Sequence, residues 1–196
     1  GDTDRWHVEK LWRLEGGSFW CWRLPTDAPE VSALPATKSG AITFGSFNNF
    51  TKLNREVTKA WTRLLQALPD ARLLVAGAPT GQTRTHFLER FTTAGIDAAR
   101  IEFFERLPGD AFRRLHHRVD IALDAFPYSG GATTCESLWM GVPVLTLAGR
   151  QGFERSATGL LTLAGLEDWI AKDGDDYVAR AVAAARDTAR LAALRA

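Results

Sequence analysis

A glycine-rich segment that leads into threonines and a glutamate is the part of this sequence that points most directly to chemistry. The segment reads Gly130-Gly131-Ala132-Thr133-Thr134, with Glu136 two residues further on. Glycines let the backbone approach a ligand closely, and a helix N-terminus offers unpaired N–H groups and partial positive charge to phosphate oxygens. A carboxylate one turn into that helix can accept hydrogen bonds from ribose hydroxyls. The segment therefore indicates a site for a nucleoside diphosphate.

A structural interpretation competes with this one. Thr133-x-x-Glu136 also has the spacing of a capping box, in which the two side chains bind the first amides of their own helix. Capping boxes are common and phosphate sites are not, so the residue types alone favour the cap. Both interpretations stay open at this point.

Lys52 is the second candidate, in the polar loop 48–52 that also contains Asn49. The loop follows a predicted strand, and a lysine there can neutralise a phosphate as a point charge. A loop lysine considered alone is more often simply solvated.

Leu107 and Phe112 belong to a third loop that follows a predicted strand. A backbone amide and an aromatic face in this position can receive a nucleobase. An aromatic at helical spacing is, however, more often part of the core.

Metal chemistry is not expected. His116 and His117 have no ligand partner at metal spacing, so they are interpreted as structural or exposed. The candidate phosphate loops contain no Asp-x-Asp pair, and Asp120 and Asp124 bracket a strand instead. No metal or other cofactor is therefore predicted.

The elements that must position these residues begin near residue 41, where short apolar runs start to alternate with amphipathic stretches. This alternation predicts an α/β fold, a Rossmann-like parallel sheet of about six strands with helices on both faces. Ligands bind such sheets beyond the carboxyl ends of the strands, where the three loops lie. Strands are expected at 41–47, 72–76, 101–104, 119–124 and 142–147, and helices at 55–68, 82–94, 109–117, 133–140, 153–164 and 175–194.

Residues 1–39 differ from the rest and are predicted to form an extended arm before a domain spanning 40–196. Aromatic side chains crowd together and prolines follow: Trp6, Trp12, Phe19, Trp20, Trp22, Pro25, Pro29 and Pro35. Proline disfavours helix and large rings bury much apolar area. The arm is expected to staple itself across the domain, or else to dock a partner.

Composition adds limits. A formal net charge of +1 gives no global attraction for nucleic acid or anionic membrane, so neither is expected as a partner. No apolar run is long enough for a membrane span, and no signal peptide is expected. Cys21 and Cys135 lack a metal or redox spacing and are interpreted as free thiols. The predicted location is the cytoplasm.

Three segments together carry a resemblance to a known family. They are residues 44–52 (FGSFNNFTK), 120–128 (DIALDAFPY) and 133–144 (TTCESLWMGVPV). The chain resembles the C-terminal catalytic half of the O-GlcNAc transferase and SPINDLY-like glycosyltransferases, in particular the bacterial members. That family has the GT-B architecture, in which two Rossmann-like domains face each other across a cleft. The resemblance implies that this chain is the half that binds the donor sugar nucleotide.

The resemblance also implies roles for individual residues. It places Lys52 on the donor diphosphate as the catalytic candidate, with Asn49 beside it, and Glu136 on the ribose. The Leu107 backbone and the Phe112 side chain fall at the base. The phosphate turn comprises Gly130, Gly131, Ala132, Thr133 and Thr134. These assignments favour the ligand site over the capping box.

Some positions depart from the family pattern. The animal enzyme has His at the position of Phe112 and a His-Thr-Thr run where residues 131–133 stand. Phe112 can stack on a base but cannot hydrogen-bond to it. Ala132 removes a hydroxyl, which leaves backbone amides and Thr133 or Thr134 to hold phosphate.

The implied reaction is inverting, metal-independent transfer of a sugar, most simply GlcNAc, from a UDP-sugar to Ser or Thr hydroxyls of proteins. The acceptor protein or peptide would bind mainly through the other domain, so the isolated chain is expected to bind UDP or UDP-sugar without turnover. The alternative is a catalytically silent module for nucleotide binding, regulation or interaction.

Overall fold

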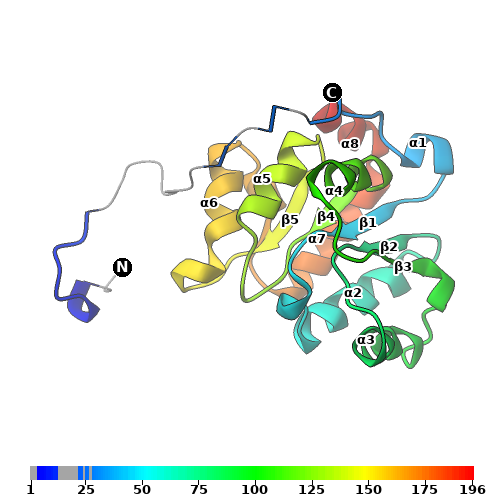
Figure 1. Ribbon diagram of the computed structural model, residues 1–196, viewed down its shortest axis with the longest axis horizontal. Coiled ribbons are helices and arrows are strands. Elements are labelled where there is room, and N and C mark those ends of the chain that lie inside the picture. Colours follow the sequence, from blue (N-terminus) through cyan, green and yellow to red (C-terminus); the bar gives the residue numbers. More distant parts are fainter. Residues whose placement is uncertain (1–3, 13–21, 24, 27) are drawn as a thin grey trace.

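The computed structural model describes residues 4–12, 22–23, 25–26 and 28–196. Six parallel strands form one sheet in the order β3-β2-β1-β4-β5-β6 (Figure 1). The strands are β1 (Thr43–Ser46), β2 (Arg72–Val75), β3 (Ile101–Phe103), β4 (Ile121–Leu123), β5 (Val144–Leu147) and β6 (Ile170–Ala171). The predicted α/β class with a Rossmann-like sheet is confirmed.

Helices cover both faces of the sheet (Figure 1). They are α1 (Ala36–Ser39), α2 (Arg55–Ala67), α3 (Gln82–Thr92), α4 (Gly109–Leu115), α5 (Ala132–Trp139), α6 (Ser156–Leu163), α7 (Gly174–Arg186) and α8 (Thr188–Arg195). Helix α2 contacts α3 and α7, whereas α5 contacts α6. Helices α2, α3 and α7 therefore share one face of the sheet, and α5 and α6 lie together on the other.

Helix α2 shows why the chain forms this core. Asn54 caps its start, because the side-chain oxygen accepts a hydrogen bond of 3.0 Å from the Val57 amide. Val57, Trp61 and Leu64 recur at helical spacing and are fully buried. The Trp61 indole also donates to the Tyr177 hydroxyl of α7 over 3.4 Å, which joins the two helices.

The final helical stretch is the largest error in the predicted elements. The helix expected at 175–194 is two helices, α7 and α8, separated at Asp187. The Asp187 side chain accepts a hydrogen bond of 3.0 Å from the Arg190 amide and so begins the second helix. The apolar face continues across the break, which is why the pattern predicts one helix.

Two other helices begin or end differently from the prediction. Helix α4 ends at Leu115, and His116–Arg118 form a tighter 3-10 turn. The stretch expected from 153 opens with the 3-10 turn Gly152–Glu154 before α6 begins. Strand β6 was not located at all, because two residues are too short to show a period.

Within the first 39 residues, some described side chains pack against the sheet and others are exposed. Leu34 and Ala36 are buried, and the Ala36 amide donates to Asp120 over 2.8 Å, so this stretch packs against the sheet. Trp6 and Trp12 are 75% and 89% exposed, so the expected staple is wrong for these two rings.

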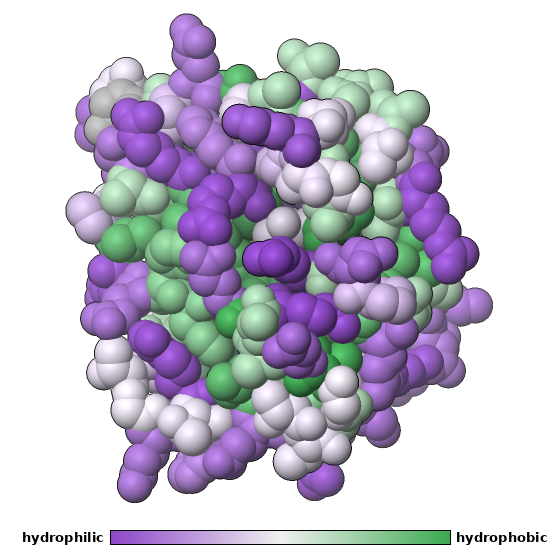
Figure 2. Space-filling model, turned by 90° about the vertical axis from the view of Figure 1, so that its right-hand side faces the viewer, coloured by the Kyte–Doolittle hydropathy of each residue, from purple (hydrophilic) through white to green (hydrophobic). Residues whose placement is uncertain are grey.

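Trp22 alone among the described tryptophans of this segment contacts the body, edge-on to Trp139 with ring centroids 5.9 Å apart. Phe19, Trp20 and Cys21 lie outside the described residues. The face of the body seen in Figure 2 is mixed, with charged and polar side chains interleaved with apolar ones. No helix in the described part of the chain is long and apolar enough to cross a membrane.

Candidate functional site

The site predicted from the sequence lies where the strand order reverses. Strands β1 and β4 are neighbours, yet the helices that follow them cover opposite faces of the sheet. The gap beyond their carboxyl ends is where open α/β sheets bind ligands. The loop that holds Lys52 follows β1, and the loop that ends in Gly130 and Gly131 follows β4.

Lys52 is held against the second of these loops. Its Nζ donates to the Ser129 carbonyl over 3.0 Å and lies 4.3 Å from the centre of the Tyr128 ring. Burial lowers the pKa of Lys52, and the charge of Asp124 acts in the opposite direction. The ammonium group is thus fixed one residue before the glycine turn rather than free in solvent.

Asn49 is exposed and starts the 3-10 turn Phe50–Lys52. Its side-chain oxygen accepts from the Thr51 amide over 3.1 Å and from the Thr51 hydroxyl over 3.0 Å. Asn49 therefore shapes the turn that carries Lys52.

The glycine turn admits no side chain at Gly130. A Cβ there would lie 2.7 Å from the Thr134 hydroxyl oxygen and 3.0 Å from Asp124 Oδ1. The Gly130 amide instead donates to Asp124 Oδ1 over 2.8 Å. Close packing of the backbone, and not flexibility, is the reason that this position needs glycine.

Gly131 precedes α5, whose first intrahelical hydrogen bond joins the Cys135 amide to the Gly131 carbonyl over 3.0 Å. The amides of Ala132, Thr133 and Thr134 precede that bond, and these are the groups that helix N-termini present to anions. Ala132 is exposed, Thr133 is half-buried and Thr134 is buried.

The capping-box interpretation is wrong. Helix α5 begins at Ala132, one residue earlier than expected, so Thr133 lies inside the helix and Gly131 is the cap residue. No side chain caps this helix. Glu136 turns instead toward α4, where its Oε1 lies 3.9 Å from Nη1 of Arg113.

The third loop reaches the same edge of the sheet. Leu107 is half-buried against the core. The half-buried Phe112 ring packs edge-on to Phe47 and His116, at centroid distances of 5.5 Å and 5.6 Å. Phe112 thus joins the apolar packing while the residue stays partly exposed.

His116 is structural, as expected. It is fully buried and stacked on Phe47 with 3.7 Å between ring centroids, and burial lowers its pKa to about 4. Its Nε2 lies 3.2 Å from the Ser137 hydroxyl of α5. His117 is half-buried, with Nε2 2.9 Å from the Glu30 carbonyl.

Asp124 is the residue at the centre of the candidate site's hydrogen bonds that the sequence did not reveal. Its fully buried carboxylate accepts hydrogen bonds from the amides of Ala125 and Gly130, from Asn48 Nδ2 and from the Thr146 hydroxyl, at 2.6–3.0 Å. Burial raises the pKa of Asp124, and these bonds favour its ionised form. The sequence pattern that could have pointed to Asp124 is its position directly after an apolar strand and six residues before a glycine pair.

No cluster of three or more potential metal ligands occurs among the described residues. Asp120 and Asp124 lie at opposite ends of β4. Cys135 on α5 is a free thiol, and burial raises its pKa.

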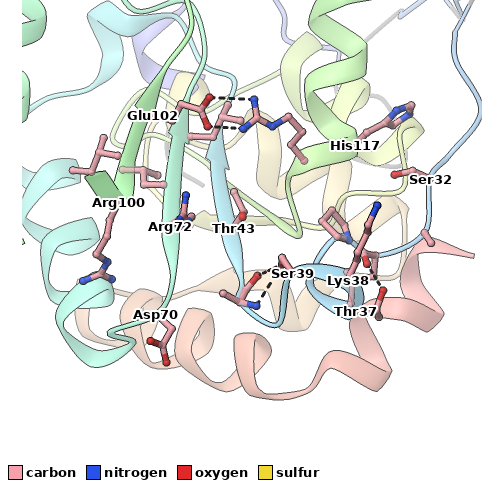
Figure 3. Close-up of a pocket in the computed structure, with 18 of the residues that line it drawn as sticks. Ser32, Thr37, Lys38, Ser39, Thr43, Asp70, Arg72, Arg100, Glu102 and His117 are labelled. Carbon is pink, nitrogen blue, oxygen red and sulfur yellow. Dashed lines mark hydrogen bonds and ion pairs between the residues drawn. The ribbon is translucent and has the colours of Figure 1, made fainter. Parts of the chain in front are cut away.

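A groove of about 1210 Å³ lies at the opposite edge, where β1, β2 and β3 begin (Figure 3). Three of its charged side chains are engaged in contacts within the fold. Arg118 pairs with Glu102 over 2.6 Å, and Arg100 donates to the carbonyls of Leu65 and Leu68 at the end of α2, both over 2.8 Å. The groove is therefore not assigned to the ligand predicted from the sequence.

With this geometry established, comparison with known proteins identifies the family. Residues 31–196 match the family described as glycosyl transferase family 41. The chain belongs to this family. The resemblance drawn from the three sequence segments is thereby confirmed.

Relatives within the family are plant, animal and bacterial proteins. The chain is 38% identical over 192 residues to a probable UDP-N-acetylglucosamine–peptide N-acetylglucosaminyltransferase SPINDLY of Solanum lycopersicum, covering 96% of this chain and 20% of the relative. It is 29% identical over 156 residues to the UDP-N-acetylglucosamine–peptide N-acetylglucosaminyltransferase of Caenorhabditis elegans, covering 80% and 14% of the two chains.

A solved structure shows the same fold. A mutant of the Thermobaculum terrenum O-GlcNAc transferase superimposes with a TM-score of 0.82 at 33% identity, covering 88% of this chain and 33% of that one. The chain thus spans about a fifth of the plant relative and a third of the solved enzyme.

Proposed function

We propose that this chain is the donor-binding half of an inverting, metal-independent glycosyltransferase that moves GlcNAc from UDP-GlcNAc to Ser or Thr hydroxyls of proteins. The observation that carries the proposal is the position of Lys52, whose ammonium group is fixed 3.0 Å from the Ser129 carbonyl at the start of the glycine turn. A fixed cation and a helix N-terminus at one point suit a diphosphate.

In this proposal the acceptor hydroxyl forms a new bond to the anomeric carbon as the bond to the diphosphate breaks. Lys52 and the first amides of α5 stabilise the negative charge that grows on the departing UDP. Groups held in place before the reaction stabilise such charge without having to reorganise. The proton of the acceptor hydroxyl passes to a base supplied by the rest of the enzyme.

The remaining predicted residues take their places around the diphosphate. Glu136, one turn into α5, accepts hydrogen bonds from the ribose hydroxyls. Phe112 stacks on the base, with the Leu107 backbone beside it. Names of the relatives support UDP-GlcNAc as donor and a protein or peptide as acceptor. The free Cys135 thiol is compatible with a reducing compartment, and we propose a cytoplasmic location.

Calorimetric titration with UDP tests the proposal. We expect Lys52→Ala to weaken UDP binding by about 10- to 100-fold, since a charge-assisted hydrogen bond contributes about 1.5–3 kcal/mol. Lys59→Ala is the matched control, because Lys59 is exposed on α2, outside the predicted site.

Equal UDP affinities for the wild type and Lys52→Ala would contradict the assignment of Lys52. We also expect the isolated chain to transfer no GlcNAc to peptide acceptors, because the acceptor side of the cleft lies in the other domain. Measurable transfer by this chain alone would overturn the half-enzyme proposal.

A further inference from the structure

Arg113 and Glu136 form an ion pair between two helices at the edge of the proposed donor site. Arg113 belongs to α4 and Glu136 to α5, and Nη1 lies 3.9 Å from Oε1. The two side chains are only 10% and 19% exposed. A pair that is this well shielded from water is screened less than a surface pair, so each charge strongly affects the other.

The guanidinium of Arg113 occupies a position that a cation does not favour by itself. It lies across the first turn of its own helix, because a Cβ on Gly109 would be 3.4 Å from Nη1. The N-terminus of a helix carries partial positive charge and repels a cation. The carboxylate of Glu136 compensates this repulsion, so the position of Arg113 and that of Glu136 depend on each other.

Buried contacts beneath the pair fix the spacing of the two helices. The Arg113 carbonyl lies 3.0 Å from His116 Nδ1, and His116 Nε2 lies 3.2 Å from the Ser137 hydroxyl. The Ser137 hydroxyl oxygen also lies 3.0 Å from the Thr133 carbonyl oxygen. This connection runs from α4 to the first turn of α5, the turn proposed to bind phosphate.

We propose that Arg113 is a positioning residue for the donor: from α4 it orients the Glu136 carboxylate of α5 toward the ribose hydroxyls. This inference rests on the proposed function, since it assigns Glu136 to the ribose of a bound UDP. Arg113 itself does not need to touch the ligand. Its contribution therefore depends on the presence of the ribose hydroxyls.

Binding of UDP and of 2′,3′-dideoxy-UDP separates this role from a general structural one. We expect the wild type to bind UDP at least about tenfold more tightly than the dideoxy analogue, because the buried carboxylate loses its hydrogen-bond partners. Glu136→Gln and Arg113→Met should both reduce this preference to about twofold or less, whereas affinity for the dideoxy analogue should change little.

Two further variants sharpen the experiment. Arg113→Lys keeps the positive charge and should restore part of the preference for UDP, and it replaces Arg113→Met if that variant does not fold. The double variant Arg113→Met with Glu136→Gln should show the same remaining preference for UDP over the dideoxy analogue as Glu136→Gln alone, because both changes act on one contact. Arg114→Met is the control, since Arg114 is an exposed neighbour paired with Asp110.

The outcomes distinguish the two proposals. An undiminished preference for UDP in Arg113→Met, together with its loss in Glu136→Gln, would overturn the role of Arg113 and leave the donor site intact. Equal weakening of both ligands by Arg113→Met would also overturn it. Failure of the wild-type chain to bind UDP would overturn the proposed function and this inference with it.

Discussion

Asp120 and Asp124 bracket strand β4, and their buried carboxylates bind different groups at the two edges of the sheet where the strands begin and end. At the amino edge, Asp120 accepts hydrogen bonds of 2.8 Å from the amides of Ala36 and Thr43, which belong to α1 and β1. At the carboxyl edge, Asp124 accepts from Gly130 and other groups of irregular loops. The first carboxylate joins regular elements, whereas the second holds the site loops in place.

The surroundings of the two carboxylates differ in the same way. Arg195 lies near Asp120, and its guanidinium donates over 2.7 Å to the carbonyls of Val119 and His116. Asp124 accepts hydrogen bonds from neutral donors, among them Asn48 and the Thr146 hydroxyl, and its charge acts on Lys52 of the site. These hydrogen bonds hold the loops in place without a ligand, which reduces the ordering cost of binding.

Removal of each carboxylate gives the largest expected effect and tests this comparison directly. Asp124→Ala leaves four donors without their acceptor and should lower the free energy of unfolding by about 4 kcal/mol. Asp120→Ala should lower it by about 3 kcal/mol, because two amides lose their acceptor. Urea denaturation measures both changes.

Ligand binding then separates the two edges. The milder variants Asp124→Asn and Asp120→Asn each keep one oxygen as an acceptor, so both should destabilise the fold less than the alanine variants and remain folded for calorimetry. We expect about tenfold weaker UDP binding for Asp124→Asn, equivalent to about 1.4 kcal/mol, and unchanged binding for Asp120→Asn. Similar losses in the two variants would mean that the edges are not functionally distinct.

His116 connects the two edges and gives the next largest effect. Its carbonyl accepts from Arg195, and its ring contacts Ser137 of α5. Because burial lowers its pKa from 6.5 to about 4, stability from neutral His116 is complete above pH 6.5 and is lost as the pH falls toward 4. The expected loss is about 3 kcal/mol over this window.

Urea denaturation at several pH values checks the His116 effect. His116→Phe keeps a flat ring against Phe47 and cannot be protonated, so its stability should lack this pH dependence. Raised pKa values of Asp120 and Asp124 act in the opposite direction, because protonation of these groups favours the folded state as the pH falls. They remain in both proteins, so the difference curve isolates His116. Parallel curves would contradict the prediction.

The predictable part of the fold is the part with a clear period. Helix α2 was found because Val57, Trp61 and Leu64 repeat at helical spacing, and its predicted bounds differ from the observed ones by one residue. Strand β6 has only two residues and therefore no period. The break at Asp187 was missed because the alanine-rich apolar face continues through it.

The candidate site also has a part that local sequence patterns predict and a part that they do not. Lys52 and the glycine turn were found because their residue types are unusual after a strand, and the structure places them together. Contacts between distant segments leave no local pattern, so the roles of Asp124 and Arg113 were not found. Asp124 binds Asn48 across a sequence separation of 76 residues. The capping box was wrong because the observed cap residue is Gly131 and not Thr133, a shift of two residues that spacing alone does not resolve.

The smallest expected effect belongs to an exposed pair in the groove at the amino edge. Arg118 donates to both carboxylate oxygens of Glu102, at 3.1 Å and 2.6 Å, but both side chains are about half exposed. Water and salt screen such a pair, so Arg118→Ala should lower the free energy of unfolding by about 1 kcal/mol or less and leave UDP affinity unchanged. A double-mutant cycle with Glu102→Ala at low and high salt measures the coupling. A loss of UDP affinity in Arg118→Ala would show that the amino edge is linked to the donor site, against the separation drawn from Asp120 and Asp124.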